Sequence, residues 1–237
     1  MTSSTENRVP RAAEGTILDL STALNSELRG HTPEGATERL SATLHQLSWL
    51  LVDSTMVAGD DIAITLRMLL KRASAQGVSI ALELNWQPQH WGLAPEAPPT
   101  AEVLRRFRTL AEAAALISAS TTEAAWFFQS GDPVSIHGAL SQRPAVLITD
   151  PTGTLHWCLG GRSGRLESIQ HPEVFLRRLL EGLSRHPELL GHSGPGVDAV
   201  ARPDPLADLL RQAADRSSDR SADSPPDSDS TSTTPSR

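Results

Sequence analysis

Residues 48–86, SWLLVDSTMVAGDDIAITLRMLLKRASAQGVSIALELNW, decide the fold of this chain. Residues 48–53 are a nearly continuous apolar run that ends in an acid, as expected for a central strand covered on both faces. Residues 61–75 repeat apolar side chains at helical spacing, and Gly77 follows where a left-handed residue is commonly needed. Residues 78–84 return as a strand. Strand, helix and strand joined by short links predict parallel neighbours in an α/β domain.

The residues upstream extend this unit by one strand and one helix. Residues 16–21 (TILDLS) alternate apolar and polar side chains, which predicts a short strand. Thr32 followed by Pro33 suits the start of a helix over residues 34–47. Residues 15–86 are therefore predicted to form a βαβαβ, sandwich-like α/β module with parallel strands.

Residues 15–93 resemble the STAS domain, the fold of anti-sigma-factor antagonists and of the cytosolic tails of sulfate transporters. In that family a strand ends in Asp-Leu-Ser and a second acid begins the next helix, and here Asp53 and Asp61 have that spacing. The passage KRASAQGV is similar to the family's helix-to-strand connection. The resemblance implies a partner-binding helix face that includes Ile62 and Leu66. It does not imply the family's phosphorylated hydroxyl, because no Ser or Thr directly follows the second acid.

The acids of this segment also allow an enzymatic interpretation. Asp53, Asp60 and Asp61 follow a predicted strand, and the carboxyl ends of parallel strands are where open α/β sheets bind ligands. Paired carboxylates can hold Mg²⁺ for a phosphohydrolase or nuclease reaction. Asp60 is also explained as the cap of the following helix, so no catalytic residue is assigned.

A second module is predicted beyond a linker. Residues 87–99 (QPQHWGLAPEAPP) are rich in proline, which predicts a Pro-rich linker between two modules. Residues 100–196 are predicted as an α+β module. Its expected helices cover residues 102–118, 122–129, 134–142 and 172–184, and its expected strands cover residues 145–149, 154–159 and 165–169. The turn Asp-Pro-Thr-Gly at residues 150–153 predicts a β-hairpin between the first two strands.

Short helix, turn, short helix and hairpin is the order of a winged helix-turn-helix. In that interpretation the candidate base-reading residues are Ser135, His137, Ser141 and Gln142, and the candidate backbone contacts are Arg162 and Arg165. Residues 134–142 contain no Arg or Lys, which weakens the case for DNA. A helix–hairpin–helix sensor with a small pocket under the sheet is the remaining alternative for this module.

The two ends and a short helix complete the organisation. Residues 1–14 and the acidic tail 215–237 are predicted to be disordered, because their composition cannot bury enough apolar surface. A short amphipathic helix is predicted at residues 203–214. Its apolar face carries Leu206, Leu209 and Leu210. This face would dock into a partner's groove or pack back on its own second module.

Composition limits the classes of function. The net charge is −7, so bulk attraction to nucleic acid is not expected. A single cysteine, Cys158, excludes an intrachain disulfide and fits a reducing compartment. Cys158 and His156 share a strand face, but no metal-binding spacing supports a zinc site, and no metal or cofactor is predicted. No apolar run is long enough to span a membrane, which predicts a cytoplasmic protein.

These observations predict a non-enzymatic cytosolic regulator or adaptor that acts by binding another protein. The alternatives are a sequence-specific DNA-binding regulator that uses residues 122–165, and a Mg²⁺-dependent phosphohydrolase or nuclease on the three aspartates. The oligomeric state and the partner are not predicted.

Overall fold

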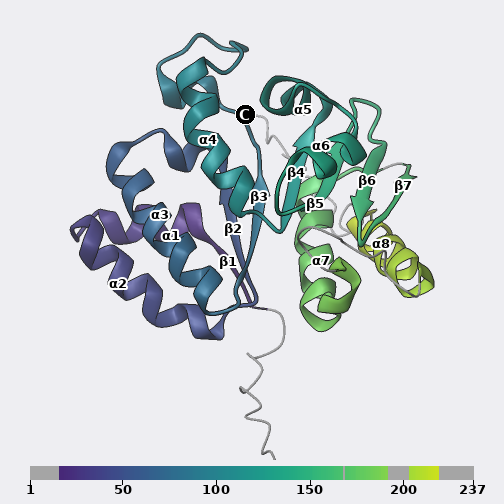
Figure 1. Ribbon diagram of the computed structural model, residues 1–237, viewed down its shortest axis with the longest axis horizontal. Helices are drawn as coiled ribbons and strands as arrows, with labels where there is room; N and C mark the ends of the chain where they lie inside the picture. The colour runs from purple at the N-terminus through teal and green to yellow at the C-terminus, as the bar shows by residue number, and fades with distance from the viewer. Residues whose placement is uncertain (1–15, 168, 192–202, 219–237) are drawn as a thin grey trace, which may run out of the picture.

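The computed structural model describes residues 16–167, 169–191 and 203–218, and these residues form one seven-stranded sheet in the order β1 to β7 (Figure 1). The strands are β1 (Ile17–Asp19), β2 (Trp49–Asp53), β3 (Ser79–Glu83), β4 (Leu116–Ser120), β5 (Ala145–Thr149), β6 (Leu155–Leu159) and β7 (Arg162–Leu166). Each strand from β1 to β5 is parallel to its neighbours in that series, whereas β6 is antiparallel to both β5 and β7. The α/β class with parallel strands is thus confirmed.

Helices cover both faces of the sheet. They are α1 (Leu20–Leu28), α2 (Pro33–Thr43), α3 (Asp60–Ala75), α4 (Ala101–Ala113), α5 (Thr121–Phe128), α6 (Pro133–Ala139), α7 (Pro172–Arg185) and α8 (Pro203–Ser218). Short 3-10 turns lie at η1 (Leu44–Gln46), η2 (Ser54–Val57), η3 (Pro88–Trp91) and η4 (Pro187–Leu190). In the described part of the chain, no helix is both long and apolar enough to cross a membrane.

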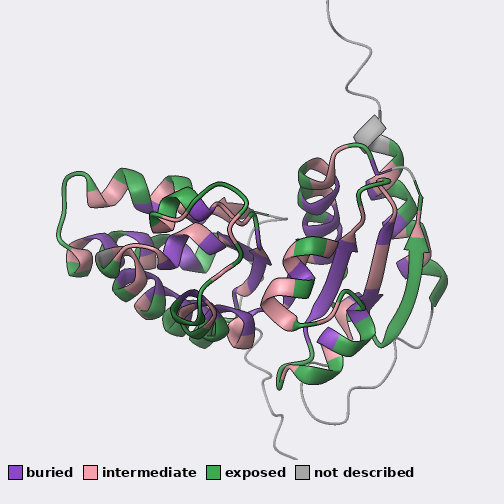
Figure 2. Ribbon diagram, turned by 90° about the horizontal axis from the view of Figure 1, so that it is seen from above, coloured by how far each residue is buried: buried purple, intermediate pink, exposed green. Residues whose placement is uncertain are grey.

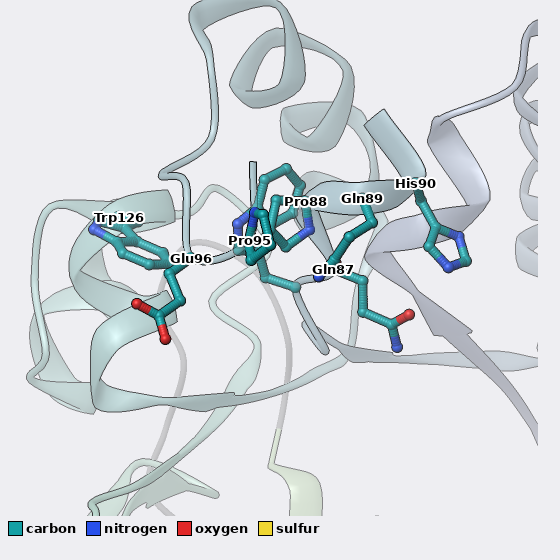
Figure 3. A pocket seen from close by; sticks show the side chains of 8 residues that line it. Gln87, Pro88, Gln89, His90, Pro95, Glu96 and Trp126 are labelled. Atoms are coloured by element: carbon teal, nitrogen blue, oxygen red, sulfur yellow. The ribbon is translucent and has the colours of Figure 1, made fainter. Parts of the chain in front are cut away.

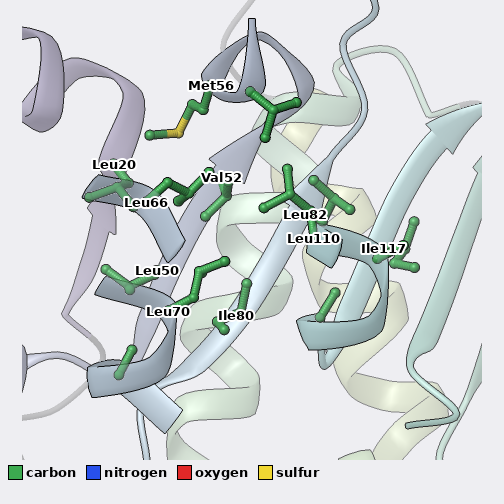
Figure 4. Packing of buried hydrophobic residues seen from close by; sticks show 14 of the residues in the cluster. Leu20, Leu50, Val52, Met56, Leu66, Leu70, Ile80, Leu82, Leu110 and Ile117 are labelled. Carbon is green, nitrogen blue, oxygen red and sulfur yellow. The ribbon is translucent and has the colours of Figure 1, made fainter. Parts of the chain in front are cut away.

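Alternate residues of the strands β2 to β5 enter two separate cores, as the period of a strand requires. Leu50, Val52 and Ile80 pack with the helices α1 to α6 on one face (Figure 4). Trp49, Leu51 and other residues of the opposite face pack with α7 and α8. The strands β2 to β5 are consequently buried between two helical layers, whereas the edge strand β7 is largely exposed, as the burial colours of Figure 2 show. This double burial explains the near-continuous apolar strand sequences.

The sheet continues across the predicted linker. β3 pairs with β4 in parallel, with Ala81 opposite Leu116, so residues 87–99 connect two neighbouring strands of one sheet. The predicted helix 102–118 was therefore wrong in its last turn, because α4 ends at Ala113 and β4 begins at Leu116. The run of alanines favours a helix locally, but pairing with strands on both sides outweighs that propensity. The two predicted modules thus share one sheet.

The winged-helix arrangement is not present. The predicted hairpin exists, since β5 pairs antiparallel with β6 and Gly153 has the left-handed backbone that its turn requires. However, β5 also pairs in parallel with β4, from Leu116 opposite Ala145 onward. The hairpin therefore extends the central sheet, and α6 packs its Ile136 against that sheet.

Helix termini account for two further differences, and the predicted strand 165–169 is found three residues earlier, as β7. The start of α2 is confirmed, because the Thr32 side chain accepts a hydrogen bond from the Gly35 N–H. The predicted strand 16–21 is shorter, because Asp19 accepts a hydrogen bond from the Thr22 N–H and begins α1 instead. Asp60 does not cap α3. Gly59 occupies that position without a side-chain bond.

The predicted helix of the tail is present and packs on the same chain. Leu206 and Leu210 of α8 are each 1% exposed and lie against α7, so this apolar face is covered. Of the two alternatives, packing on the own chain is the one found. The predicted disordered residues 1–14 and most of the tail, from 219 onward, lie outside the described residues.

The contact between α7 and α8 can be tested at Gly182. A Cβ added there would collide with the Leu209 side chain of α8, so Gly182→Ala is expected to destabilise the fold by about 1–3 kcal/mol. Urea unfolding measures this loss. The loss should shrink in a Leu209→Ala background, because the colliding atoms are then absent.

Gly138 provides the matched control for this prediction. It also lies in a helix, α6, but an added Cβ there meets no atom within 4 Å. Gly138→Ala is therefore expected to leave stability unchanged or slightly increased. Equal losses at both glycines would contradict the proposed packing of α8.

Candidate functional site

A cleft of about 330 Å³ opens at the carboxyl ends of β3, β4 and β5. Its wall combines residues at the end of β3 (Glu83, Asn85), residues of β4 and the start of α5 (Ser118, Ser120, Thr122, Glu123), and residues at the end of β5 (Thr149, Asp150). Pro172, the first residue of α7, closes one side. This edge is where open α/β sheets bind their ligands. The cleft is therefore the candidate functional site.

Glu83 is the most unusual acid of the cleft. It ends β3 half-buried, and burial raises the pKa of its carboxyl above the ordinary value. The negative charges of Asp53, Glu173, Glu123 and Asp19 raise it further, in that order. Its carboxylate makes no hydrogen bond or ion pair with any described residue. A carboxyl with a raised pKa and a free lone pair is suited to accept a proton.

The other acids at this edge are occupied by local structure. Asp53 accepts hydrogen bonds from the backbone N–H and the hydroxyl of Thr55. Asp150 accepts bonds from Thr152 and Thr154 within the hairpin turn, and the bond from the Thr152 hydroxyl is the main cause of its lowered pKa. These carboxylates hold loops in place, so they are less available to a ligand than Glu83.

Glu123 joins two segments of the cleft wall. Its Oε2 accepts bonds from the backbone N–H and the hydroxyl of Ser120, both at 2.8 Å, and forms a capping box at the start of α5. Its Oε1 accepts a bond from the Trp86 N–H at 2.6 Å. One carboxylate thus ties the loop after β3 to the start of α5.

The lining of the cleft defines which ligands fit. It contains acids, an amide and several hydroxyls, and the described residues that line it include no Lys or Arg. Such groups form hydrogen bonds to hydroxyls, whereas they offer a bare phosphate no opposite charge. Among the described residues, no group of three or more His, Cys, Asp or Glu is placed to hold a metal ion.

A second, wider groove of about 710 Å³ lies beside the cleft (Figure 3). It is formed by the loop after β3 and by Trp126 of α5. Its lining includes Trp86, Gln87, Gln89, His90 and Glu96, so it combines indole rings with polar side chains. Figure 3 shows Trp126 and His90 at opposite ends of this groove, with Glu96 and Gln87 between them.

The structure does not bring the three predicted aspartates together as one site. Asp53 lies at the carboxyl edge close enough to influence Glu83. Asp60 instead forms an ion pair with Arg106 of α4, with Oδ1 2.9 Å from Nη1. The side chain of Asp61 lies outside what the structure describes.

The predicted DNA-reading residues are engaged in local contacts. Ser135 donates to Asp132, and Ser141 donates to Glu112 of α4. The His137 ring lies 2.9 Å from the Pro144 carbonyl. Of the other predicted DNA-contacting residues, Gln142 lines a pocket together with residues of α3 and α4. Arg162 and Arg165 lie on β7.

The predicted partner-binding residues belong largely to the core. Leu66 is 1% exposed and Ile62 packs partly buried against the first core, so α3 offers no free face there. Leu209 packs with Leu206 and Leu210 in the second core. His156 lies 3.7 Å from Asp150, and Cys158 is buried with a pKa raised by burial.

The fold is similar to those of solved kinases. The fructokinase of Xylella fastidiosa with bound ATP has a TM-score of 0.58 and 20% identity, covering 74% of this chain and 54% of that chain. An uncharacterized sugar kinase from Pyrococcus horikoshii has a TM-score of 0.53 and 15% identity, with coverages of 74% and 51%. The aminoimidazole riboside kinase of Salmonella enterica has a TM-score of 0.50 and 14% identity, with coverages of 70% and 53%.

This chain thus spans about half the length of the kinases that it resembles. At these identities the likeness shows the fold alone. No protein-family model matches the sequence, and no curated protein matches it either.

These neighbours correct the predictions made from the sequence. The STAS resemblance was wrong, because it rested on β2, α3 and β3, a strand–helix–strand unit that many α/β folds share. The prediction of a non-enzymatic regulator with a protein or DNA partner was wrong, since the structural neighbours are kinases. The hydrolase or nuclease built on three aspartates is corrected by the same finding.

Sequence reasoning missed Glu83, Asn85, Ser120, Glu123 and Trp126. The first two lie at the carboxyl end of a correctly predicted strand, so the rule for carboxyl ends could have identified them. Ser120 and Glu123 have the spacing of a capping box, which the sequence contains. They were missed because β4 was assigned to a helix, and no sequence signal marked Trp126.

Proposed function

We propose that this chain binds a small hydroxylated molecule, a sugar or nucleoside, in the cleft at the carboxyl ends of β3 to β5. We further propose that it acts on this molecule as a kinase, with ATP as phosphoryl donor. One observation carries the proposal. In a fold shared with sugar and nucleoside kinases, Glu83 places an unpaired carboxyl of raised pKa in a hydroxyl-lined cleft.

Glu83 is assigned the role of general base. Its carboxylate accepts the proton of a substrate hydroxyl while that oxygen attacks the terminal phosphorus of ATP. The bond between this phosphorus and the bridging oxygen breaks, so ADP leaves and a phosphate ester forms. The raised pKa makes Glu83 a stronger base than an ordinary carboxylate, and its half-buried position limits competition from water.

The charge of the cleft determines how ATP can enter. Its described lining lacks Lys and Arg, so the nucleotide's phosphates need a counter-ion. Carboxylate, amide and hydroxyl oxygens suit Mg²⁺, which usually binds through one or two carboxylates and the phosphates themselves. Asn85 and Thr149 are the residues that would contact such an ion, which would supply charge neutralisation when bound, and Glu83 would stay free to accept the proton.

Phosphate transfer tests the proposal. The full chain is incubated with radiolabelled ATP, Mg²⁺ and a panel of sugars and nucleosides, and label in the sugar fraction is measured. At least one substrate is expected to be labelled, and omission of Mg²⁺ is expected to abolish the labelling. Binding of a sugar without transfer would contradict the kinase part of the proposal and leave the binding part standing.

A further inference from the structure

We propose that the groove beside the cleft is a second binding subsite, which accepts an uncharged ring attached to the molecule held in the cleft. The inference rests on the proposed function and names the substrate class more closely. The substrate would have two rings, such as a nucleoside or a disaccharide. One ring lies near Glu83, and the other lies against the tryptophans of the groove.

The Trp86 ring is held in a fixed position. Its indole N–H donates to the Ala97 carbonyl at 2.8 Å, and its backbone N–H donates to Glu123. Its ring meets Phe127 edge-on, with centroids 5.5 Å apart and planes at 70°. An aromatic ring that is already ordered loses little entropy when a ligand packs on it.

Trp126 supplies the other aromatic wall. It lies on α5, and its side chain is only half-buried. Its indole N–H makes no hydrogen bond with the described residues, so it is free to donate to a ligand. An indole offers both a flat apolar face and one donor, which suits a hydroxylated or heteroaromatic ring.

The polar groups of the groove suit a hydrogen-bonding ligand without negative charge. Gln87, Gln89 and His90 offer donors and acceptors, and Glu96 offers a carboxylate. The described lining contains no Lys or Arg to bind a phosphate. Glu96 lies in a turn that is closed by the bond from the Ala97 N–H to the Ala94 carbonyl, and its left-handed backbone, with φ at 64°, belongs to that turn.

The loop after β3 contributes residues to both the groove and the cleft. Asn85 lines the cleft and Trp86, the next residue, lines the groove. The Gln87 amide donates to the Asn85 side-chain oxygen at 3.3 Å, which links the two linings. Asn85 has φ at 40°, so the chain bends where the two sites meet. The proposed ligand of two connected rings would lie along this loop, with one ring in each site.

Calorimetry with matched probes tests the inference on the full chain. The single-ring probes are ribose and glucose, and the two-ring probes are adenosine and maltose. At least one two-ring probe is expected to bind at least about tenfold more tightly than its single-ring counterpart, because a ring stacked on an aromatic side chain usually adds this much affinity. The adenosine and maltose arms then distinguish a heteroaromatic ring from a second sugar.

Trp126→Ala is expected to remove this advantage and leave the single-ring affinity unchanged, while Trp126→Phe should retain most of it. Equal binding of single-ring and two-ring probes would overturn the groove inference alone. If the single-ring probes do not bind, but the two-ring probes bind in a way that depends on Trp126, then the proposed ligand site in the cleft is overturned. The inference about the groove would then stand. No binding by any probe would overturn both.

Discussion

Replacing Glu83 with glutamine is expected to reduce kcat by about 100- to 10,000-fold, because the amide cannot accept the proton of the attacking hydroxyl. The same change is expected to stabilise the folded chain at neutral pH. Burial and the surrounding acids raise the pKa of Glu83, so its ionised form is unfavourable in the fold. Glutamine removes that charge and keeps the shape. Phosphate-transfer kinetics and thermal unfolding measure the two effects.

The stabilisation should depend on pH with a definite sign. A carboxyl whose pKa is raised by folding favours the folded state when protonated, and this benefit is lost as the pH rises through the folded-state pKa. The advantage of Glu83→Gln should therefore be largest above the raised folded-state pKa. It should vanish as the pH falls below the ordinary range of glutamate.

Glu181, an exposed acid on α7, gives the matched control for Glu83. Glu181→Gln should leave both kcat and stability close to the wild-type values. An active Glu83→Gln variant would exclude Glu83 as the base. A variant that is inactive but also destabilised at neutral pH would contradict the account of its raised pKa.

Glu123→Ala is expected to cost about 2 kcal/mol of folding free energy and to weaken binding of both rings of the proposed substrate. The carboxylate accepts bonds from the N–H groups of Trp86 and Ser120, and removing it leaves these donors without their partner. The loop after β3 and the start of α5 would then separate, which disturbs the cleft and the groove together. Urea unfolding measures the first effect, and calorimetry measures the second.

Two further variants make this prediction specific. Glu123→Gln retains one acceptor oxygen, so its loss should be smaller than that of the alanine variant. Glu181→Ala, at an exposed site, should change stability by no more than about 0.5 kcal/mol. If Glu123→Ala is as stable as Glu181→Ala, then the three hydrogen bonds do not hold the cleft wall.

The sequence was sufficient to predict the first half of the sheet. β2, α3 and β3 were predicted within a few residues, because their apolar periods are strong and Gly77 marks the end of the helix. The β5–β6 hairpin was also predicted, since Pro and Gly define its turn. These elements carry local signals, which a single sequence preserves.

The joining of the two halves could not be predicted in the same way. β4 follows a run of alanines and contains Leu116, so its local sequence is compatible with a helix. Only its pairing with β3 and β5, which lie far from each other in the sequence, makes it a strand. With β4 missed, Ser120 and Glu123 could not be placed at the carboxyl edge.

The candidate site was harder to predict than the fold. Asp53, Asp60 and Asp61 were considered as one site because they lie close together in the sequence. In the structure, Asp60 forms an ion pair with Arg106 on a different helix. Glu83 stands out only through its burial and its acidic neighbours, which come from β1, β2, α5 and α7. A pKa shift of this kind depends on spatial contacts and has no sequence motif.

The most direct test of the proposed function is a crystal structure of the full chain with the tightest-binding sugar or nucleoside of the panel. The predicted result is a ligand in the cleft at the ends of β3 to β5, with one hydroxyl at hydrogen-bond distance from the Glu83 carboxylate. A ligand bound elsewhere, or bound in the cleft with no hydroxyl near Glu83, would contradict the account.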